Sequence, residues 1–268
     1  MKLVVITGCL GFIGSHVTKK CLELGWKVLG IDNFTYAANE DLVGYFFEKH
    51  SDNFNFIRSD IAELKYLPDC DYVINTAAET HVGNSIIDSK DFLKSNINGV
   101  QNLLDLIKSK PNNVDNRPIL FHFSTDEVYG DIVSGDHYET DHLNPSNPYS
   151  ASKAAADMLI TAWARTYGIE YIIFRPTNNY GEYQYPEKLI PLSVKLLQRD
   201  KKIRLHDEGR PVRNWLHAED TANAVISIIN SGKTNEIYNV AGGFEQENRD
   251  TVKKIIECFH GKDTNWLD

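Results

Sequence analysis

The sequence predicts an α/β fold of the doubly wound type, in which helices cover both faces of a parallel sheet, followed by a smaller α/β lobe. Short runs of β-branched and apolar residues alternate with amphipathic stretches long enough for helices, as in successive βαβ units. A glycine-rich turn, "TGCLGFIGSH", follows the first apolar run and opens the first amphipathic stretch. Together these observations predict a Rossmann-like sheet.

The first part of the chain carries most of the expected elements. The run 3–7, "LVVIT", predicts a strand buried on both faces, and the helix after it ends near Gly25. Further strands are expected at 27–32, 53–60, 71–79, 119–124 and 169–176. Helices are expected at 89–109 and 149–167, and loops at the polar stretches 110–118 and 131–148.

After about residue 176 the alternation becomes less regular. Helices are expected at 187–199, at 219–230 and from 248, with strands at 203–206 and 237–240. We therefore predict a dinucleotide-binding domain over 1–176, with later segments interleaved in its sheet, and a smaller substrate-binding lobe over 177–268.

The composition restricts the function classes. The chain has 268 residues, 42% of them apolar, and a net charge of −9, so a full core is expected but no nucleic-acid or anionic-membrane surface. The four cysteines are scattered without ligand spacing, which argues against a disulfide framework and a metal site. The start "MKLVVITG" predicts a strand, not a signal peptide, and no apolar run approaches the roughly 18 residues of a membrane span. A cytoplasmic protein is expected.

The glycine-rich turn indicates a dinucleotide site. Gly8, Gly11 and Gly14 let the backbone approach a pyrophosphate at the positive end of a helix dipole. Asp32 ends the second strand, where a carboxylate can accept both ribose hydroxyls and would repel a 2′-phosphate. NAD is therefore expected rather than NADP. The alternative is three turn glycines and a helix cap without a ligand.

Small and polar residues follow the third and fourth strands, at the carboxyl ends where open α/β sheets bind ligands. Asp60 and Ile61 are placed to flank an adenine. Ala77 and Ala78 are small enough for the backbone to pass close to a dinucleotide. Each of these pairs is also common in ordinary loops.

Two further motifs carry reactive groups. Tyr149 and Lys153 in "YSASK" share one helix face, and a nearby ammonium favours the phenolate, so the tyrosine is expected to act as a base. In "FHFSTDEVYG", Asp126 and Glu127 follow Thr125 at a strand end. Ionising one of two adjacent carboxylates raises the pKa of the other, which suits a reaction that needs one acid and one base. An exposed acidic turn is the alternative.

The chain resembles the extended short-chain dehydrogenase/reductases, and among them the nucleotide-sugar 4,6-dehydratases, over nearly its whole length. The shared stretches are "GFIGSH", "DNFTYAAN", "AAETHVGNSI", "STDEVYG", "NPYSASKAAAD", "NNYGEYQYPEKLIP" and "YNVAGG". The resemblance implies that Tyr149 takes the proton of the sugar 4-hydroxyl while C4 gives hydride to NAD. Thr125 would bond the same oxygen, and Lys153 would hold the ribose and tune the tyrosine. Glu127 would remove the C5 proton, Asp126 would protonate the departing 6-hydroxyl, and hydride would return to C6.

The resemblance also implies the binding residues. The cofactor set is Gly8, Gly11, Phe12, Ile13, Gly14, Asp32, Asn33, Phe34, Thr35, Asp60, Ile61, Ala77, Ala78, Thr80, Ser95, Tyr149, Lys153 and Asn179. The substrate set is His81, Ser85, Thr125, Asn178, Lys188, Leu189, Arg213 and Asn248. Lys188 and Arg213 are candidates for the diphosphate, while a structural role for His81 is equally open.

The resemblance implies a nucleotide-sugar substrate, no metal and a homodimer. In the homodimer, small and apolar residues of the helix at 149–167 would pack on a second subunit. These residues are Ala154, Ala155, Leu159 and Trp163. Packing of the same residues on the chain's own sheet explains the pattern equally well.

Two departures from the family pattern affect the reaction. Gly83 and Asn84 stand where the glucose dehydratases usually carry an Asp-Arg pair, and the sequence ends at Asp268, so a C-terminally shortened lobe is expected. A smaller lid would admit water to the 4-keto-5,6-ene intermediate, and C5 epimerisation is therefore a hypothesis. UDP-N-acetylglucosamine stands beside dTDP-glucose and UDP-glucose as substrate.

Two other function classes are open. A sugar-nucleotide 4-epimerase of the same superfamily would keep Tyr149 and Lys153 but would not need Asp126 and Glu127. A non-catalytic NAD-sensing Rossmann module can lose the reactive tyrosine, so the presence of Tyr149, Lys153 and Thr125 counts against it.

Overall fold

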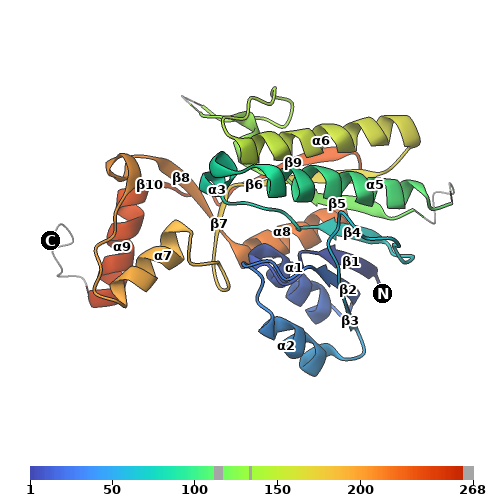
Figure 1. Ribbon diagram of the computed structural model, residues 1–268, viewed down its shortest axis with the longest axis horizontal. Coiled ribbons are helices and arrows are strands. Elements are labelled where there is room, and N and C mark those ends of the chain that lie inside the picture. The colour runs from blue at the N-terminus through green and yellow to red at the C-terminus, as the bar shows by residue number, and fades with distance from the viewer. Residues whose placement is uncertain (112–116, 133–134, 262–268) are drawn as a thin grey trace.

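The computed structural model describes residues 1–111, 117–132 and 135–261 (Figure 1). Its main sheet has seven strands in the order β3-β2-β1-β4-β5-β6-β9, and every neighbouring pair is parallel. This order confirms the predicted doubly wound fold. The strands are β1 (Leu3–Thr7), β2 (Lys27–Asp32), β3 (Phe54–Arg58), β4 (Tyr72–Asn75), β5 (Ile119–Phe123), β6 (Tyr171–Pro176) and β9 (Glu236–Val240).

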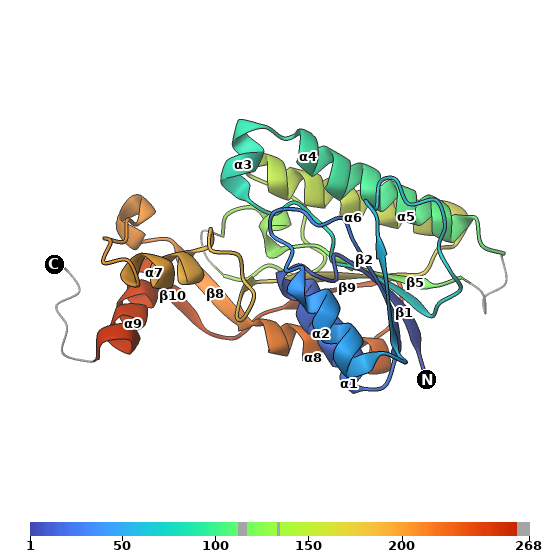
Figure 2. The same ribbon diagram turned by 60° about the horizontal axis from the view of Figure 1, so that its bottom comes forward.

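Helices cover both faces of this sheet, as Figures 1 and 2 show. One face carries α1 (Phe12–Glu23), α2 (Asp41–His50) and α8 (Ala218–Ser231). The other carries α3 (Val82–Ile87), α4 (Lys90–Phe92), α5 (Gly99–Lys108) and α6 (Pro148–Tyr167). Alternate residues of β1 enter the two cores: Val4 and Ile6 pack toward α1, and Val5 packs toward α5. This two-sided burial explains why the strand is apolar throughout.

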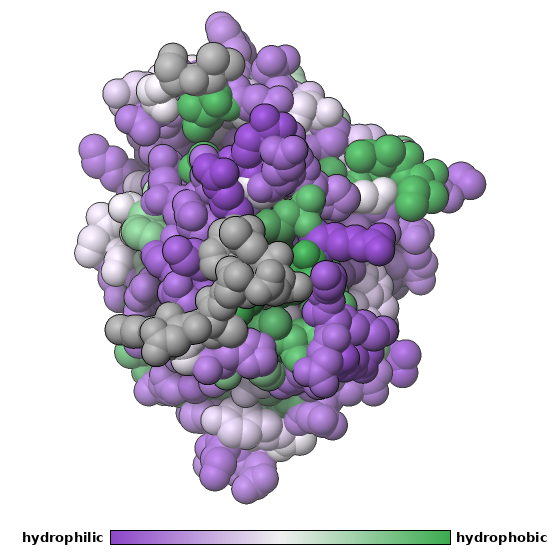
Figure 3. Space-filling model, turned by 90° about the vertical axis from the view of Figure 1, so that its left-hand side faces the viewer, coloured by the Kyte–Doolittle hydropathy of each residue, from purple (hydrophilic) through white to green (hydrophobic). Residues whose placement is uncertain are grey.

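A second, three-stranded sheet has the order β10-β8-β7. Its strands are β7 (Asn178–Tyr180), β8 (Val212–His217) and β10 (Glu245–Glu247), and the helices beside them are α7 (Leu189–Leu197) and α9 (Asn248–His260). Figure 3 views this end of the molecule, whose surface is largely hydrophilic with small apolar patches. In this part of the chain Phe244 is 48% exposed and Phe259 is 43% exposed. From the same part of the chain, α8 and β9 return to the main sheet (Figure 1).

Several elements differ from those expected from the sequence. The helix expected at 89–109 is interrupted by a π-helical segment, Leu93–Asn98, between α4 and α5. The prediction of a strand at 203–206 is wrong: within 135–261 these residues pair with no strand, and the partners of β8 are β7 and β10 instead. Strands β3 and β4 are shorter than the expected 53–60 and 71–79.

Two helices were not expected from the sequence. In α2 the apolar pair Leu42 and Phe46, four residues apart, is buried, but Gly44 between them weakens the helical signal. In α3 no periodic apolar pattern is present, and the histidine that begins it, His81, is an uncommon N-cap. The predicted loops 110–118 and 131–148, and the end of the predicted lobe 177–268, include 112–116, 133–134 and 262–268, which lie outside the described residues.

None of the helices in the described ranges combines the length and the apolar content that crossing a membrane requires. The same part of the chain contains no group of three or more His, Cys, Asp and Glu side chains that could hold a metal ion.

Candidate active site

The glycine-rich turn between β1 and α1 is closely packed. Gly8 has a φ of +69°, and a Cβ there would lie 2.7 Å from the backbone of Ala77. A Cβ at Gly14 would lie 2.0 Å from the carbonyl oxygen of Gly8. Because Gly11, the N-cap of α1, has no side chain, the first backbone N–H groups of the helix are left for a ligand. The turn can therefore keep this conformation, which suits pyrophosphate binding, only while Gly8 and Gly14 are glycine.

Asp32 closes β2 beside this turn. Its Oδ2 accepts a hydrogen bond from Leu10 N at 3.0 Å, and its Oδ1 accepts one from Phe34 N at 3.0 Å. Burial raises the pKa of Asp32, and the backbone N–H groups oppose this rise. The backbone thus fixes the carboxylate in the position expected for ribose recognition.

One cleft at the carboxyl ends of the parallel strands brings most of the predicted residues together. Loop residues after β1, β2, β3, β4 and β5 line it, and so do the start of α6 and the segment 176–188. Of the predicted residues, Phe34, His81, Ser85, Lys153, Leu189, Arg213 and Asn248 are not part of its lining, and all the others are. The cleft therefore brings together most of the predicted cofactor set and, apart from Lys153, the predicted catalytic set.

The two adjacent acids lie in a 3-10 turn, Asp126–Tyr129, directly after β5. Thr125 caps this turn: its Oγ1 accepts from Glu127 N at 3.3 Å and donates to Asp126 Oδ1 at 3.2 Å. Burial, and then the charge of Glu127, raise the pKa of Asp126 to about 6. Glu127 Oε2 instead accepts a hydrogen bond from Asn147 Nδ2 at 3.3 Å. The two carboxyl groups therefore have unlike environments, which suits one acid and one base.

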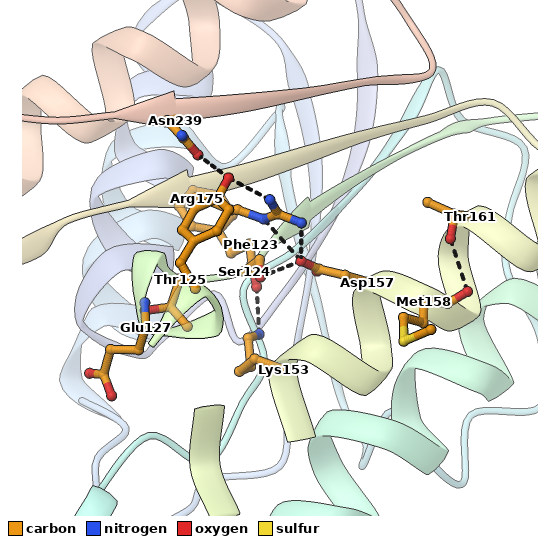
Figure 4. Close-up of polar contacts among 11 residues, drawn as sticks. Phe123, Ser124, Thr125, Glu127, Lys153, Asp157, Met158, Thr161, Arg175 and Asn239 are labelled. Carbon is orange, nitrogen blue, oxygen red and sulfur yellow. Dashed lines mark hydrogen bonds and ion pairs between the residues drawn. The ribbon is translucent and has the colours of Figure 1, made fainter. Parts of the chain in front are cut away.

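Tyr149 and Lys153 are both buried at the start of α6. Burial and then the charges of Glu127 and Asp126 raise the pKa of Tyr149, while a hydrogen bond with Thr125 opposes them. Lys153 Nζ donates to Phe123 O at 2.5 Å (Figure 4), and burial lowers the pKa of Lys153 to about 8. Burial is the largest cause of the raised pKa of Tyr149, and a role of Lys153 in lowering that pKa stays a prediction.

Several predicted residues have structural contacts. Ser85 Oγ accepts from Tyr149 N at 3.2 Å and so anchors the first turn of α6. His81 Nδ1 accepts from Asn84 N at 3.0 Å as the N-cap of α3. Phe34 packs against Phe56, with ring centroids 5.5 Å apart, on the side of the nucleotide loop. A direct ligand role for these three stays a prediction.

The segment after β7 reaches across the cleft. Lys188 Nζ donates to Thr80 O at 3.1 Å, and Glu187 Oε1 accepts from Tyr36 OH at 3.2 Å. The charge of Arg213 lowers the pKa of Asp126, so this arginine acts on the acid turn although it does not line the cleft. Asn248 Oδ1 is buried and has no hydrogen-bond partner among the described residues.

The helix residues expected to meet a second subunit are largely internal. Ala154 packs against Val128 and Tyr129. Leu159 and Trp163 pack against the core between the sheet and α5. The exposed face of α6 instead carries Met158, which is 66% exposed.

Sequence reasoning missed two asparagines. Asn147 caps α6 by accepting from Ser150 N at 2.9 Å, and it also contacts Glu127. Its position directly before Pro148 was the available signal, since proline favours the first turn of a helix.

Asn96, in the π-helical segment, accepts a hydrogen bond from the N–H of Glu79 and donates one to its carbonyl, both at 2.9 Å. Nothing in the sequence around Asn96 indicated these contacts.

The family model for the NAD dependent epimerase/dehydratase family matches residues 4–241 of this chain. The chain belongs to this family. Among family relatives, a probable dTDP-glucose 4,6-dehydratase of Sinorhizobium fredii is 38% identical over an alignment of 263 residues, and the match covers 94% of this chain and 75% of the relative.

Solved structures of the NAD dependent epimerase/dehydratase family superpose closely on this chain. The dTDP-glucose 4,6-dehydratase of Bacillus anthracis in complex with NAD has a TM-score of 0.86 and 33% identity, and the match covers 98% of this chain and 83% of that one. The UDP-glucuronic acid 4-epimerase of Bacillus cereus in complex with UDP-glucuronic acid and NAD has a TM-score of 0.88 and 26% identity, with coverages of 98% and 84%. The fold is therefore shared by dehydratases and epimerases, and the site must distinguish them.

Proposed function

We propose that this protein is an NAD-dependent nucleotide-sugar 4,6-dehydratase that forms a 4-keto-6-deoxy sugar nucleotide. The acid pair at the end of β5 carries the proposal: Asp126 has a pKa raised to about 6, and Glu127 is bonded to Asn147. The elimination of water across C5 and C6 needs a proton acceptor at C5 and a proton donor at the 6-hydroxyl, and this turn presents both in one cleft with Tyr149.

The cofactor site fits NAD. The turn is packed so closely at Gly8 and Gly14 that neither position can carry a Cβ, and Asp32 is held by two backbone N–H groups at the end of β2. When bound, NAD supplies the hydride acceptor for C4 and the hydride donor for C6, and its nicotinium ring carries positive charge. That charge is what a deprotonated Tyr149 requires against the two nearby carboxylates.

The chain's own residues divide the proton transfers between them. Tyr149 accepts the proton of the sugar 4-hydroxyl, and Thr125, which bonds Tyr149, steadies the same oxygen. The resulting 4-ketone acidifies C5–H, which Glu127 removes. Asp126 then protonates the 6-hydroxyl as it leaves. Lys153 donates a hydrogen bond to Phe123 O, two residues before Thr125.

A panel of dTDP- and UDP-hexoses in heavy water tests the proposal. We expect each product to have lost one water and to carry one deuterium, taken from the solvent, at C5. Mass spectrometry and NMR measure both changes. The responding sugar nucleotide identifies the base and the C2 substituent, including UDP-N-acetylglucosamine. Complete retention of the C5 configuration would reject the C5-epimerase hypothesis, and a mixture of configurations would support it.

A 4-epimerase is the second candidate, because the superposed Bacillus cereus structure is an epimerase. An epimerase returns the hydride to C4 and needs no acid pair near C5 and C6. Unchanged mass with an inverted C4 in the same experiment would replace the dehydratase assignment. Recovery of every sugar nucleotide unchanged, despite NAD binding, would favour an NAD-sensing module.

We also propose a homodimer, formed by the face that carries α3, α4 and α6. Apolar side chains on these helices and the π-helical segment between α4 and α5 are exposed on this face. They are Ile86 (66%), Ile87 (86%), Leu93 (47%) and Met158 (66%). Burial of such a patch favours association.

A further inference from the structure

A buried ion pair lies beside the acid turn. Arg175 at the end of β6 and Asp157 on α6 have side chains that are each 3% exposed. Arg175 Nη2 and Nε both donate to Asp157 Oδ2, at 2.9 Å and 3.1 Å. The lining of the catalytic cleft includes neither residue. The pair therefore has no direct part in the proton transfers proposed above.

On one side, Asp157 is joined to the residues that precede the acid turn. Ser124, the residue before Thr125, donates its hydroxyl hydrogen bond to Asp157 Oδ2 at 2.9 Å (Figure 4). Lys153 lies one helical turn before Asp157 on α6. The carboxylate charge raises the pKa of Lys153, against the larger effect of burial.

On the other side, Arg175 is joined to the residue that ends the acid turn. Arg175 Nη1 donates to Tyr129 OH at 2.5 Å, and its guanidinium carbon lies 4.8 Å from the centroid of the Tyr129 ring. Tyr129 OH in turn donates to Asn239 Oδ1 at 2.8 Å on β9 (Figure 4). The ion pair is thus bonded to Ser124 before the turn and to Tyr129 at its end.

Stability alone does not account for this arrangement. Desolvating two charges is costly, and well-packed apolar residues often replace a buried ion pair without loss of stability. In addition, Asp157 Oδ1 is buried without a hydrogen-bond partner among the described residues, which adds to that cost.

We propose that Asp157 and Arg175 are positioning residues for the reaction: through Ser124 and Tyr129 they hold both ends of the acid turn. This inference rests on the proposed function, which assigns proton transfers to Thr125, Asp126 and Glu127. The pair fixes these residues relative to Tyr149, which is carried by the same helix as Asp157. A shift of the turn by even about 1 Å can cost roughly a hundredfold in rate.

Two variants test the two halves of this hydrogen-bond network separately: Asp157 with Ser124, and Arg175 with Tyr129. Asp157→Asn keeps the size and an acceptor for Ser124 but removes the charge, and Tyr129→Phe removes only the hydroxyl. We expect each to lower kcat by at least about tenfold while KM changes by less than about twofold, since the interactions lost act on the reacting geometry. Stopped-flow absorbance of the reduced cofactor follows C4 oxidation, and water loss is followed separately. Tyr129→Phe should slow water loss more than C4 oxidation.

The pH profile provides a readout that a purely structural role would not move. The titratable groups around Lys153 are Asp157 and Tyr149 on its own helix and His122 on β5, and burial lowers the pKa of His122 so that it stays neutral. Without the Asp157 charge, Lys153 loses its proton at a lower pH. The alkaline limb of C4 oxidation in Asp157→Asn should therefore move to lower pH.

Ile160→Val is the matched control, because Ile160 is fully buried on the same helix and belongs to the apolar core. It should lower Tm without changing kcat. Wild-type kcat and pH profile in both Asp157→Asn and Tyr129→Phe, with only Tm reduced, would overturn the proposal. C4 oxidation is common to dehydratases and epimerases. A wild-type protein that oxidises C4 but releases no water would therefore contradict the proposed function. The effect of Asp157→Asn on C4 oxidation could still be measured in that case.

Discussion

Asp126 and Glu127 are neighbours in the chain, but their surroundings differ. Burial raises the pKa of Asp126 from 3.8 to about 6, so the folded chain keeps this proton at pH values where the unfolded chain has released it. The folded state is therefore destabilised as pH rises through this range, by at most about 3 kcal/mol for a shift of about two units.

We expect Asp126→Asn to leave the free energy of unfolding little changed near pH 4 and to raise it by up to about 3 kcal/mol above pH 6. Urea denaturation at both pH values measures the difference. The same variant should lose dehydration, because an amide cannot protonate the leaving hydroxyl. An equal gain in stability at both pH values would mean that the raised pKa is not its cause.

Glu127→Gln tests the other acid. It should still bind substrate and allow C4 oxidation, because Tyr149, Thr125 and Lys153 are unchanged, but it should block elimination. The expected signature is a burst of reduced cofactor with at least about a hundredfold slower water loss. Full turnover by this variant would refute the assignment of Glu127 as the base at C5.

Gly14 has the tightest backbone contact in the glycine-rich turn. A Cβ there would lie 2.0 Å from Gly8 O, so Gly14→Ala must displace the turn that receives the pyrophosphate. NAD affinity should fall by at least about tenfold, measured by calorimetry. Gly44→Ala in α2 is the control, since a Cβ there meets nothing within 4 Å and alanine favours a helix interior. Unchanged NAD affinity in Gly14→Ala would show that the turn tolerates the shift.

At the scale of elements, the N-terminus of α6 joins stability to chemistry. Asn147 caps the helix through Ser150 N, and its Nδ2 donates to Glu127 Oε2. Asn147→Asp keeps a capping oxygen but places a second carboxylate against Glu127. Stability should stay within about 0.5 kcal/mol while kcat falls. Asn147→Ala should lose about 1 kcal/mol and also lower kcat, and thermal unfolding with steady-state kinetics separates the two. A wild-type kcat in Asn147→Asp would show that the hydrogen bond between Asn147 and Glu127 does not contribute to catalysis.

Local sequence signals predicted the elements that are defined by local physics. The strand "LVVIT" and the glycine turn after it are predicted from the sequence, because burial on both faces requires apolar residues and a positive φ favours glycine. The three-stranded sheet β10-β8-β7 was not predicted, because its short strands depend on partners distant in the chain. Residues 203–206 resemble a strand locally, but within 135–261 they pair with no strand.

The candidate site follows the same division. Thr125, Asp126, Glu127 and Tyr149 occur in compact motifs, and the structure places all four in one cleft. The Asp157–Arg175 pair was missed although both charges stand in otherwise buried patterns, on "AAADML" and "IIFRP". A charge within a buried pattern indicates a partner but does not identify it, since the partner here lies 18 residues away on another element.

For the whole molecule, the part with the seven-stranded sheet and the part with the three-stranded sheet are joined where the chain passes from β6 to β7. We propose the boundary between them near Thr177, with α8 and β9 belonging to the first part although they follow it in sequence. The cleft is lined from both sides of this boundary, by the glycine turn and by the segment 176–188. Movement of the lobe would therefore open or close the cleft.

The proposed dimer interface on α3, α4 and α6 can be tested by charge. Ile87 is 86% exposed on α3 and Met158 is 66% exposed on α6, so a paired Ile87→Asp and Met158→Asp variant would introduce charge into the centre of the proposed interface. We expect sedimentation to show a dimer for the wild type and a monomer for this variant, because unpaired charges are costly in a buried interface. Tyr45→Glu, on α2 at the opposite face of the sheet and 40% exposed, should remain dimeric. A wild-type monomer would refute the dimer. A dimer that survives both aspartates would place the interface on another face.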